Sequence, residues 1–483
     1  MKVNGRRTTL FILIALVLSA CGGASAPQTQ GGATQGATAS AGEANTGATA
    51  STGAAGAEAQ PSAAPAAGGE KVKIALWTDP PDAGSANCFG EAAVKPFNAQ
   101  SSTIEVDITE QPNSWDATRT AIAGGAGPDI VTTPGPSFAF ELAKAGQLLP
   151  LDDFIQEFGW SKTFLPWALN LGKVEGKTYS IPNELETLIL YYNKTLFEKN
   201  GWQPPKTLDE LMALSEKIKA AGVIPFAHGN ADWRPTNEWF AGEFLNHGAG
   251  PQAVYEALTG KRPWNDPVFA QPINMLNDMQ QKGYFMGGLD RYYTAKADER
   301  HTAFGKGEAA MNIEGTWFLS DIDNFFGEKA GNNNDWDWVP MPSKTGDAIY
   351  DLGIGSTYSI NKASQHPREV AEFLNYLFSS DVQAQLLIKC KSAPAPVRLS
   401  PDALKQLDPR DAKIREGLTQ ASDSGNYGYT TWTFWPPKSD VYIYEEIEKV
   451  WAKQETPEQY LDGLQKLFAQ ELQAGDIPPI PAR

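Results

Sequence analysis

Cysteine and histidine are both scarce in this chain of 483 residues, which contains three cysteines and four histidines. The histidines are scattered, and no HExxH pattern or Cys/His cluster with the spacing of metal ligands occurs. We therefore expect the histidines in loops or at the surface, and we expect neither a metal nor a cofactor. The four are His228, His247, His301 and His366.

Positive charge is also in deficit, because 40 Lys and Arg stand against 57 Asp and Glu, a net charge of -17. Nucleic-acid binding depends on cationic contacts to phosphates, so the composition excludes it as a main function. No GxSxG elbow of a serine hydrolase occurs. The segment 172–178, GKVEGKT, is one residue too short for a phosphate-binding loop and fits the turn of a hairpin.

No apolar run reaches the ~20 residues that a membrane span needs. The longest near the start covers 10–18, follows a basic segment, and ends in small residues before Cys21. This layout is that of a secretory signal peptide over 1–21. It resembles the lipobox of bacterial lipoproteins, which implies that Cys21 is lipidated and holds the protein at the outer face of the cell membrane.

Residues 22–70 consist almost entirely of Ala, Gly, Ser, Thr, Gln and Pro, and only three of them are charged. Such a segment cannot bury enough apolar surface to offset the entropy of ordering, so we predict a disordered linker. A flexible chain of this length spans roughly 40 Å on average.

The rest of the chain, 71–483, is long enough for two domains. Short strand patterns alternate with helical patterns, which predicts an α/β fold with a mostly parallel sheet. The predicted strands are 71–77, 103–110 and 129–132, and the predicted helices are 88–98, 115–123, 138–145, 208–222, 368–378 and 457–472.

Two cysteines, Cys88 and Cys390, remain once Cys21 is lipidated. Disulfides persist outside the cytoplasm, so we hypothesise that the two pair. A disulfide that closes the long loop from Cys88 to Cys390 would stabilise the fold by roughly 5 kcal/mol, if its effect is the lost entropy of the unfolded chain. Two unrelated buried thiols are the alternative.

Several segments in fixed order resemble the family 1 extracellular solute-binding proteins of ABC importers, of the maltose-binding-protein type. They are GAGPDIV (125–131), LLPLDDFI (148–155), the stretch 174–211, FGKGEAAMNIEGTWF (304–318) and LGIGSTYSINKAS (352–364). The resemblance covers about 71–472. It implies a two-lobe periplasmic-binding-protein fold, type II-like, with hinge-linked lobes and a ligand cleft between them. The N-terminal lobe would hold 71–184 and 351–398, and the C-terminal lobe 187–350 and 399–483.

Tryptophan is abundant, with 14 in the chain. Sugars present apolar CH faces and many hydroxyls, so their sites combine aromatic faces with carboxylates and amides. Trp77 and Asp79 follow the first predicted strand, and Asn113 and Trp115 follow the second. Ligands of open α/β sheets gather at this edge.

The resemblance adds further candidates in the crossing strand, the second lobe and the returning strand. They are Glu186, Asp232, Trp233, Glu238, Trp317, Gly355, Trp432 and Trp435. After GPDI the chain continues TTPGPSF, where maltose-type proteins carry an aromatic and charged residues, which argues against maltose as the solute.

These observations predict a monomeric lipoprotein that is not an enzyme, captures a mono- or oligosaccharide and delivers it to an ABC permease. One alternative is a secreted carbohydrate-active enzyme on a similar scaffold. Another is a receptor for a different solute. Arg119 and Arg234 would serve a glycerol phosphoester, whereas Glu184, Glu186 and Asp232 would serve a polyamine.

Overall fold

A computed structural model describes residues 70–79, 87–234 and 236–481. The predicted signal peptide with Cys21, and the predicted linker up to residue 69, lie outside these residues. Residues 67–483 form one compact unit. Within its described part, no helix combines the length and the apolar character needed to cross a bilayer.

The first of two main sheets has the strand order β12-β11-β3-β1-β2, with β6 also pairing with β11. Strand β1 lies parallel to both β2 and β3, as the alternation of strands and helices predicted, whereas β11 runs antiparallel to β3 and β6. The strands are β1 (Val72–Thr78), β2 (Ile104–Glu110), β3 (Ile130–Thr133), β6 (Ser180–Glu186), β11 (Asp351–Ile360) and β12 (Gly428–Tyr429).

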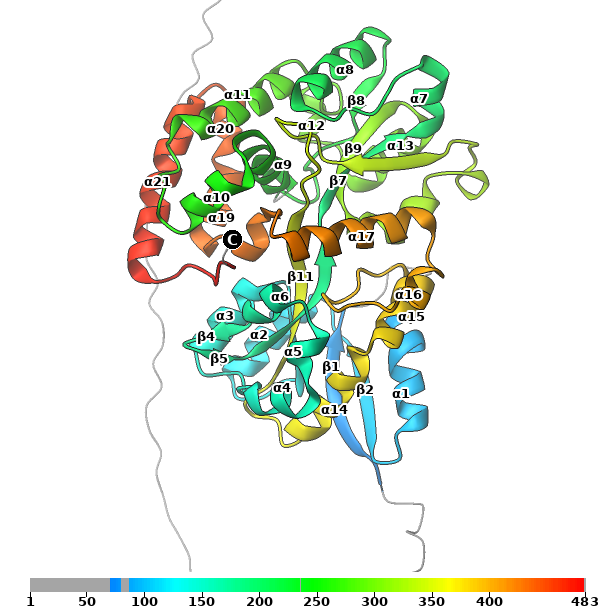
Figure 1. Cartoon of the computed structure of the whole chain (residues 1–483), viewed down its shortest axis with the longest axis vertical. Coiled ribbons are helices and arrows are strands. Elements are labelled where there is room, and N and C mark those ends of the chain that lie inside the picture. The colour runs from blue at the N-terminus through cyan, green and yellow to red at the C-terminus, as the bar shows by residue number, and fades with distance from the viewer. Residues whose placement is uncertain (1–69, 80–86, 235, 482–483) are drawn as a thin grey trace, which may run out of the picture. The chain divides into compact units, whose positions relative to one another are not determined.

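The second sheet has the order β10-β7-β9-β8. In Figure 1 the elements around β1 and β2 lie at the lower end of this unit and those around β7 and β9 at the upper end, while β11 runs between them. The chain passes from the first sheet to the second directly through β6 and β7. Its strands are β7 (Leu188–Asn193), β8 (Ile224–Phe226), β9 (Ala309–Gly315) and β10 (Trp336–Pro340).

Helices surround both sheets. In chain order those up to residue 170 are the π-helical turn η1 (Gly90–Val94), α1 (Lys95–Gln100), α2 (Ser114–Ala123), α3 (Pro136–Lys144), α4 (Asp152–Phe158), α5 (Trp160–Thr163) and α6 (Pro166–Asn170). Next come α7 (Lys194–Asn200), α8 (Leu208–Ala220), α9 (Thr236–Phe244), the π-helical turn η2 (Leu245–Ala249), α10 (Pro251–Leu258), α11 (Pro267–Gln281), α12 (Leu289–Tyr292) and α13 (Ala297–Lys306).

The remaining helices follow β9. They are the 3-10 turns η3 (Thr316–Ser320), η4 (Ile322–Asn324) and η5 (Glu328–Ala330), then α14 (Pro367–Leu377), α15 (Ser380–Cys390), α16 (Pro401–Leu404), α17 (Pro409–Ser424), α18 (Thr431–Phe434), α19 (Pro437–Glu445), α20 (Ile447–Trp451) and α21 (Pro457–Ala474).

Capping residues explain why the longer helices begin where the sequence predicted. Thr207 and Glu210 form a reciprocal capping box at the start of α8, and Thr456 does the same with Gln459 at α21. The segment 172–178 contains the predicted hairpin, in which β4 (Lys173–Val174) pairs with β5 (Lys177–Thr178).

The two sheets have separate hydrophobic cores. Residues such as Ile74, Ile130 and Phe373 pack around the first sheet, whereas Ile189, Leu211 and Phe240 belong to the larger core of the second. The predicted lobe boundaries themselves stay a prediction.

The predicted disulfide is present and joins Cys88, at the start of the first helical segment, to Cys390 at the end of α15. The two cysteines are separated by 302 positions in the sequence. The two segments that carry the cysteines contact each other and share the hydrophobic core of the first sheet.

Candidate functional site

A cavity of about 570 Å³ lies at the carboxyl ends of the parallel strands β1, β2 and β3. Trp77 and Asp79 from the end of β1 line it, as do Ser114 after β2 and Glu184 on β6. This is the edge at which open α/β sheets bind ligands. Its volume is within the range of small-molecule sites, roughly 300–1,000 Å³.

The second pair of predicted site residues, Asn113 and Trp115, follows β2, and hydrogen bonds between Asp79 and Ser114 hold the loop that carries them. Asp79 accepts hydrogen bonds of 2.8 Å from both the backbone N and the Oγ of Ser114, at the start of α2. Asn113 precedes it with a left-handed φ of 51°. Trp115 is half-buried and packs edge-on against Phe138, with ring centroids 5.4 Å apart. Ser114 lines the cavity, whereas its predicted neighbours Asn113 and Trp115 are not among the residues that line it.

Two acidic residues of β6 extend this polar surface toward the second sheet. Burial raises the pKa of Glu186 well above its ordinary range, and the nearby charge of Glu184 raises it further, against the opposing effect of Arg415. The Glu186 carboxylate lies over Gly355 on β11, where an added Cβ would come within 2.5 Å of it. Because Gly355 has no side chain, it leaves the space that the Glu186 carboxylate occupies.

Three half-buried tryptophans form a cluster at the other end of this surface. The Trp317 ring lies 5.0 Å from that of Trp239 and 5.9 Å from that of Trp432, centroid to centroid. Trp432 covers Gly353, on the same face of β11 as Gly355, so its ring and the Glu186 carboxylate share one face of that strand. We name Trp239, Trp317 and Trp432 the indole cluster.

Glu314 on β9 positions the Trp317 ring. The Trp317 Nε1 donates to Glu314 Oε1 at 3.1 Å, while Arg300 Nη1 and His301 Nε2 lie 2.5 and 3.2 Å from the other oxygen. Burial alone raises the pKa of Glu314, but Arg300, His301 and His228 outweigh it and hold this pKa far below its ordinary range. The carboxylate thus stays charged and keeps the indole in place.

Four predicted site residues lie elsewhere. Asp232 is exposed and accepts from the Ala297 backbone N at 2.8 Å, and Trp233 is 58% exposed. The contacts found in the described ranges join neither of them to the cavity or to the indole cluster.

The other two, Glu238 and Trp435, are buried, so the expectation that they face a solute is corrected. Glu238 turns into the protein toward Asp440, and burial together with that carboxylate raises its pKa well above the ordinary range. Trp435 is 2% exposed and stacks on Trp264 at 4.4 Å. The Trp- and Pro-rich sequence around Trp435 suggested an exposed turn, but tertiary packing against Trp264 buries this side chain.

The resemblance placed Trp239, with Glu238, where the family has a carboxylate–aromatic pair, whereas sequence reasoning left Glu314 out of the candidate site. Trp239 stands next to Glu238, and on a helix one residue rotates a side chain by about 100°, so the aromatic reaches the cluster while the acid does not. Nothing in the sequence pattern marks Glu314 as the residue that holds Trp317.

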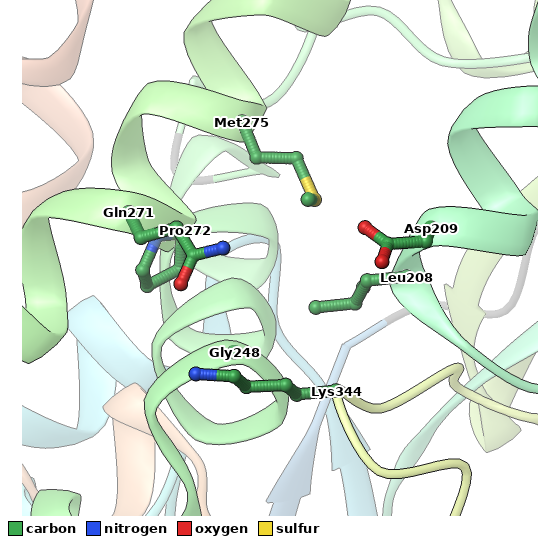
Figure 2. A pocket seen from close by; sticks show the side chains of 7 residues that line it. All are labelled: Leu208, Asp209, Gly248, Gln271, Pro272, Met275 and Lys344. Atoms are coloured by element: carbon green, nitrogen blue, oxygen red, sulfur yellow. The ribbon is translucent and has the colours of Figure 1, made fainter.

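Other cavities differ in character. The one at Gly248, Met275 and Lys344 (Figure 2) has a volume of about 60 Å³, too small for a sugar ring. A larger one of about 450 Å³ lies between α17 and residues 394–399 and is walled mainly by apolar side chains.

With this geometry established, comparison with known proteins identifies the family. The family model described as bacterial extracellular solute-binding protein matches residues 89–384. The chain belongs to this family. An uncharacterized ABC transporter extracellular-binding protein of Pyrococcus horikoshii is 29% identical over 50% of this chain and 52% of its own length. The chain thus spans about half the length of that relative.

Two further relatives carry functional names. The sn-glycerol-3-phosphate-binding periplasmic protein UgpB of Rhizobium meliloti is 26% identical over 63% of this chain and 71% of its own. The multiple sugar-binding protein of Streptococcus mutans is 25% identical over 59% of this chain and 66% of its own.

Among solved structures, a chitin oligosaccharide binding protein superposes with a TM-score of 0.64. The match covers 83% of this chain and 99% of that one, at 23% sequence identity. The predicted two-lobe binding-protein fold is thereby confirmed for this member of the family.

Proposed function

We propose that this chain is the sugar receptor of an ABC importer, which captures a mono- or oligosaccharide outside the cell membrane and delivers it to the permease. The observation that carries the proposal is the indole cluster beside the Glu186 carboxylate. Indole faces pack on the CH faces of a sugar ring, and carboxylates accept from its hydroxyls.

The proposed site has two parts. Trp77, Asp79 and Glu184 belong to the cavity at the first sheet, and the indole cluster belongs to the side of the second sheet. A solute that contacts both parts binds the closed arrangement of the lobes better than the open one, and only this difference in affinity drives closure. The connecting strands β6 and β11 would bend as hinges.

The names of the relatives support the same solute class. Both a sequence relative and a structural neighbour are named for binding sugars, one for multiple sugars and one for chitin oligosaccharides. We propose further that Cys21 anchors a monomeric receptor through lipid, as the lipobox-like sequence indicates.

A glycerol phosphoester is the second candidate, because UgpB is a relative. The local charges favour it less. Arg119 is paired with Asp116 at 3.2 Å, and Arg234 is held by Glu445 and Glu448 at 3.0 and 2.8 Å. The two acidic residues of β6, Glu184 and Glu186, offer a phosphate no positive charge.

Isothermal titration calorimetry on the purified chain tests the proposal. The panel comprises mono- and oligosaccharides, glycerol 3-phosphate and spermidine, and we expect tight binding of one or more sugars. Trp317→Ala and Trp432→Ala should each weaken that binding about tenfold or more. Trp202, half-buried against Phe197 and outside the cluster, supplies the control Trp202→Ala.

Sugar affinity that is unchanged in both cluster variants would refute this site. If only glycerol 3-phosphate or only spermidine bound tightly, that compound would replace sugars as the proposed solute. Hydrolysis of aryl glycosides by the wild-type chain would favour the enzyme alternative.

A further inference from the structure

Three side chains that can bind a metal meet inside the protein, one helical turn along α9 from Trp239 of the indole cluster. Glu243, His247 and Asp351 are each 1% exposed. Glu243 lies in the last turn of α9, His247 lies in the π-helical turn η2, and Asp351 begins β11. Within the described residues, this is the one group of His, Cys, Asp and Glu side chains whose potential ligand atoms come together, within 4.8 Å of one another.

The local backbone explains how the group forms. Glu243 and His247 are four residues apart, so a helical segment places both on one face. The segment continues as a π-turn at 245–249, a distortion often found at functional sites. Asp351 fits beside Gly428 on β12, where an added Cβ would lie 1.7 Å from Asp351 Oδ1. Glycine at 428 therefore leaves room for this carboxylate.

The three side chains lie within contact distance of one another. His247 Nε2 lies 3.3 Å from Glu243 Oε2 and 3.4 Å from Asp351 Oδ1, and the two carboxyl groups interact directly. Among the described residues, no group outside these three bonds to either ring nitrogen of His247, to either carboxylate oxygen of Asp351 or to Oε2 of Glu243. Buried polar groups are nearly always paired, so this concentration of unpaired ligand atoms calls for a missing partner.

The spacing suits one particular partner. Zinc binds His nitrogen and carboxylate oxygen at about 2.0–2.2 Å in tetrahedral geometry, which sets neighbouring ligand atoms roughly 3.3–3.5 Å apart. The two measured separations fall in this range. A divalent cation would also balance the charge of the two carboxylates, which Arg300 does for the other buried His–Glu group, at Glu314.

We propose that Glu243, His247 and Asp351 bind a divalent transition-metal ion, Zn²⁺ by the nature of its ligands. Both oxygens of Asp351 are free to take part. The site is closed to solvent, so the ion enters as the chain folds and its binding energy becomes folding energy. It ties α9 and η2 of the second half to the first residue of β11, the strand that leads back to the first sheet. The buried position of His247 in η2 corrects the expectation that it lies in a loop or at the surface, and the proposal departs from the expectation of no metal.

The test begins with the untagged full chain, expressed in medium supplemented with zinc, because a polyhistidine tag would bind metal itself. Elemental mass spectrometry should find about one zinc per chain after exhaustive dialysis. Glu243→Gln and Asp351→Asn should each lose most of it. Glu471, also a buried carboxylate but bonded to Ser439 Oγ and two backbone N–H groups, supplies the matched control Glu471→Gln, which should keep the metal.

A second measurement does not depend on variants that fold. The wild-type chain is unfolded in chelator and refolded with or without Zn²⁺, and the metal should raise the midpoint of thermal unfolding. Refolding with Co²⁺ should give the intense visible absorption of a tetrahedral ion. A wild-type chain that holds no metal and melts identically after both refoldings would overturn the site. So would metal that both variants retain, whereas a different divalent ion lost in both would overturn only the assignment to zinc.

Discussion

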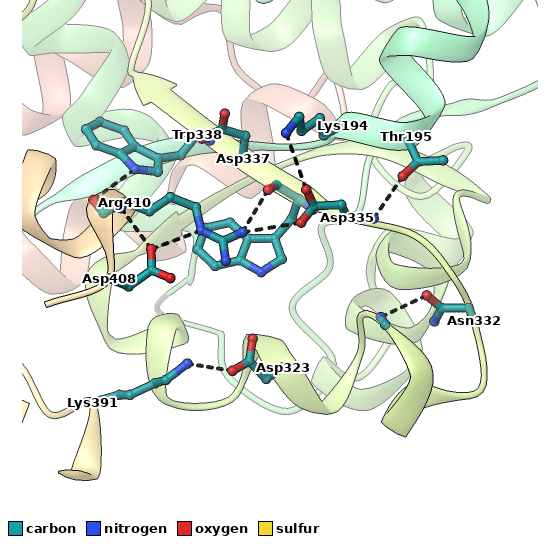
Figure 3. Close-up of polar contacts among 12 residues, drawn as sticks. Lys194, Thr195, Asp323, Asn332, Asp335, Asp337, Trp338, Lys391, Asp408 and Arg410 are labelled. Carbon is teal, nitrogen blue, oxygen red and sulfur yellow. Dashed lines mark hydrogen bonds and ion pairs between the residues drawn. The ribbon is translucent and has the colours of Figure 1, made fainter. Parts of the chain in front are cut away.

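Lys391, the residue after the disulfide-bonded Cys390, places its Nζ 2.5 Å from Oδ2 of Asp323 (Figure 3). The lysine directly follows α15, which packs in the core of the first sheet, and the aspartate belongs to η4, whose Ile322 is in the core of the second. One ion pair thus joins a segment packed in the core of the first sheet to one packed in the core of the second, next to the disulfide.

We expect Asp323→Asn to weaken sugar binding, because the pair contributes to the arrangement in which the halves are together. The two side chains are 38% and 55% exposed, so the pair is worth at most about 1 kcal/mol, or about a fivefold change in affinity. Calorimetry at low and high salt checks this, since salt should shrink the effect. Asp402→Asn, which breaks the exposed Lys405–Asp402 pair, is the control. A loss that is larger and independent of salt would contradict this prediction.

Substitutions of Trp435 and Trp432 should have different effects, the first mainly on stability and the second mainly on sugar binding. Trp435→Ala leaves a cavity beside Trp264 and should lower the free energy of unfolding by about 3–5 kcal/mol. Trp432→Ala removes a half-buried ring and should cost less stability but more sugar affinity. Urea unfolding and calorimetry on the same preparations measure both. Equal effects of the two substitutions on both quantities would disagree with the placement of these rings.

The Cys88–Cys390 disulfide should act mainly on stability. Replacing both cysteines by alanine should lower the free energy of unfolding by about 2–5 kcal/mol. Guanidinium unfolding with and without a phosphine reductant tests this. The reductant should lower the midpoint of the wild-type chain and leave that of the double variant unchanged. A wild-type midpoint that ignores the reductant, with the bond shown to be broken, would speak against a stabilising role.

The Glu314 carboxylate should make stability depend on pH in the acid range. Its pKa is far below the ordinary 4.5, so its stabilising effect is complete above the pKa of the unfolded chain and is lost as the pH falls toward the folded value. Glu314→Gln should cost about 3–5 kcal/mol at neutral pH, because it strips a buried Arg300 of its partner. The gap to wild type should narrow as the pH drops below 4.5.

Glu157 provides the comparison for that experiment. Its pKa is also lowered, through a hydrogen bond from Arg368, but the carboxylate is fully exposed. Glu157→Gln should therefore change stability far less at every pH. A gap between wild type and Glu314→Gln that stays constant from neutral to acid pH would show that the carboxylate is not the titrating group.

Local signals were enough to predict much of the fold. Helix α8 and helix α21 were predicted because apolar residues recur at helical spacing after a capping threonine, and both features act within one segment. The strand β1 and the hairpin β4–β5 were recognisable for the same reason. The order of the segments that resemble the solute-binding family then predicted the two-lobe architecture.

The site was predictable only in part, because burial is decided by partners distant in sequence. Trp317 and Trp432, both named from the resemblance, lie in one cluster, and their contact with a solute stays a prediction. Trp435 is three residues further along, yet its ring turns into the core against Trp264. Asp351 and His247 are likewise brought together by strand pairing with β12 and by a π-turn, neither of which has a pattern in the sequence.

Gly315, Gly353 and Gly355 have a consequence for how specificity evolves in such receptors. A methyl group at any of these positions would collide with Trp317, Trp432 or Glu186 respectively. In the proposed site, residues that set the positions of the contact side chains therefore need never touch the solute. Exchanging one hydrogen for a methyl group on the backbone beneath would change the solute that fits while every proposed contact residue stays the same.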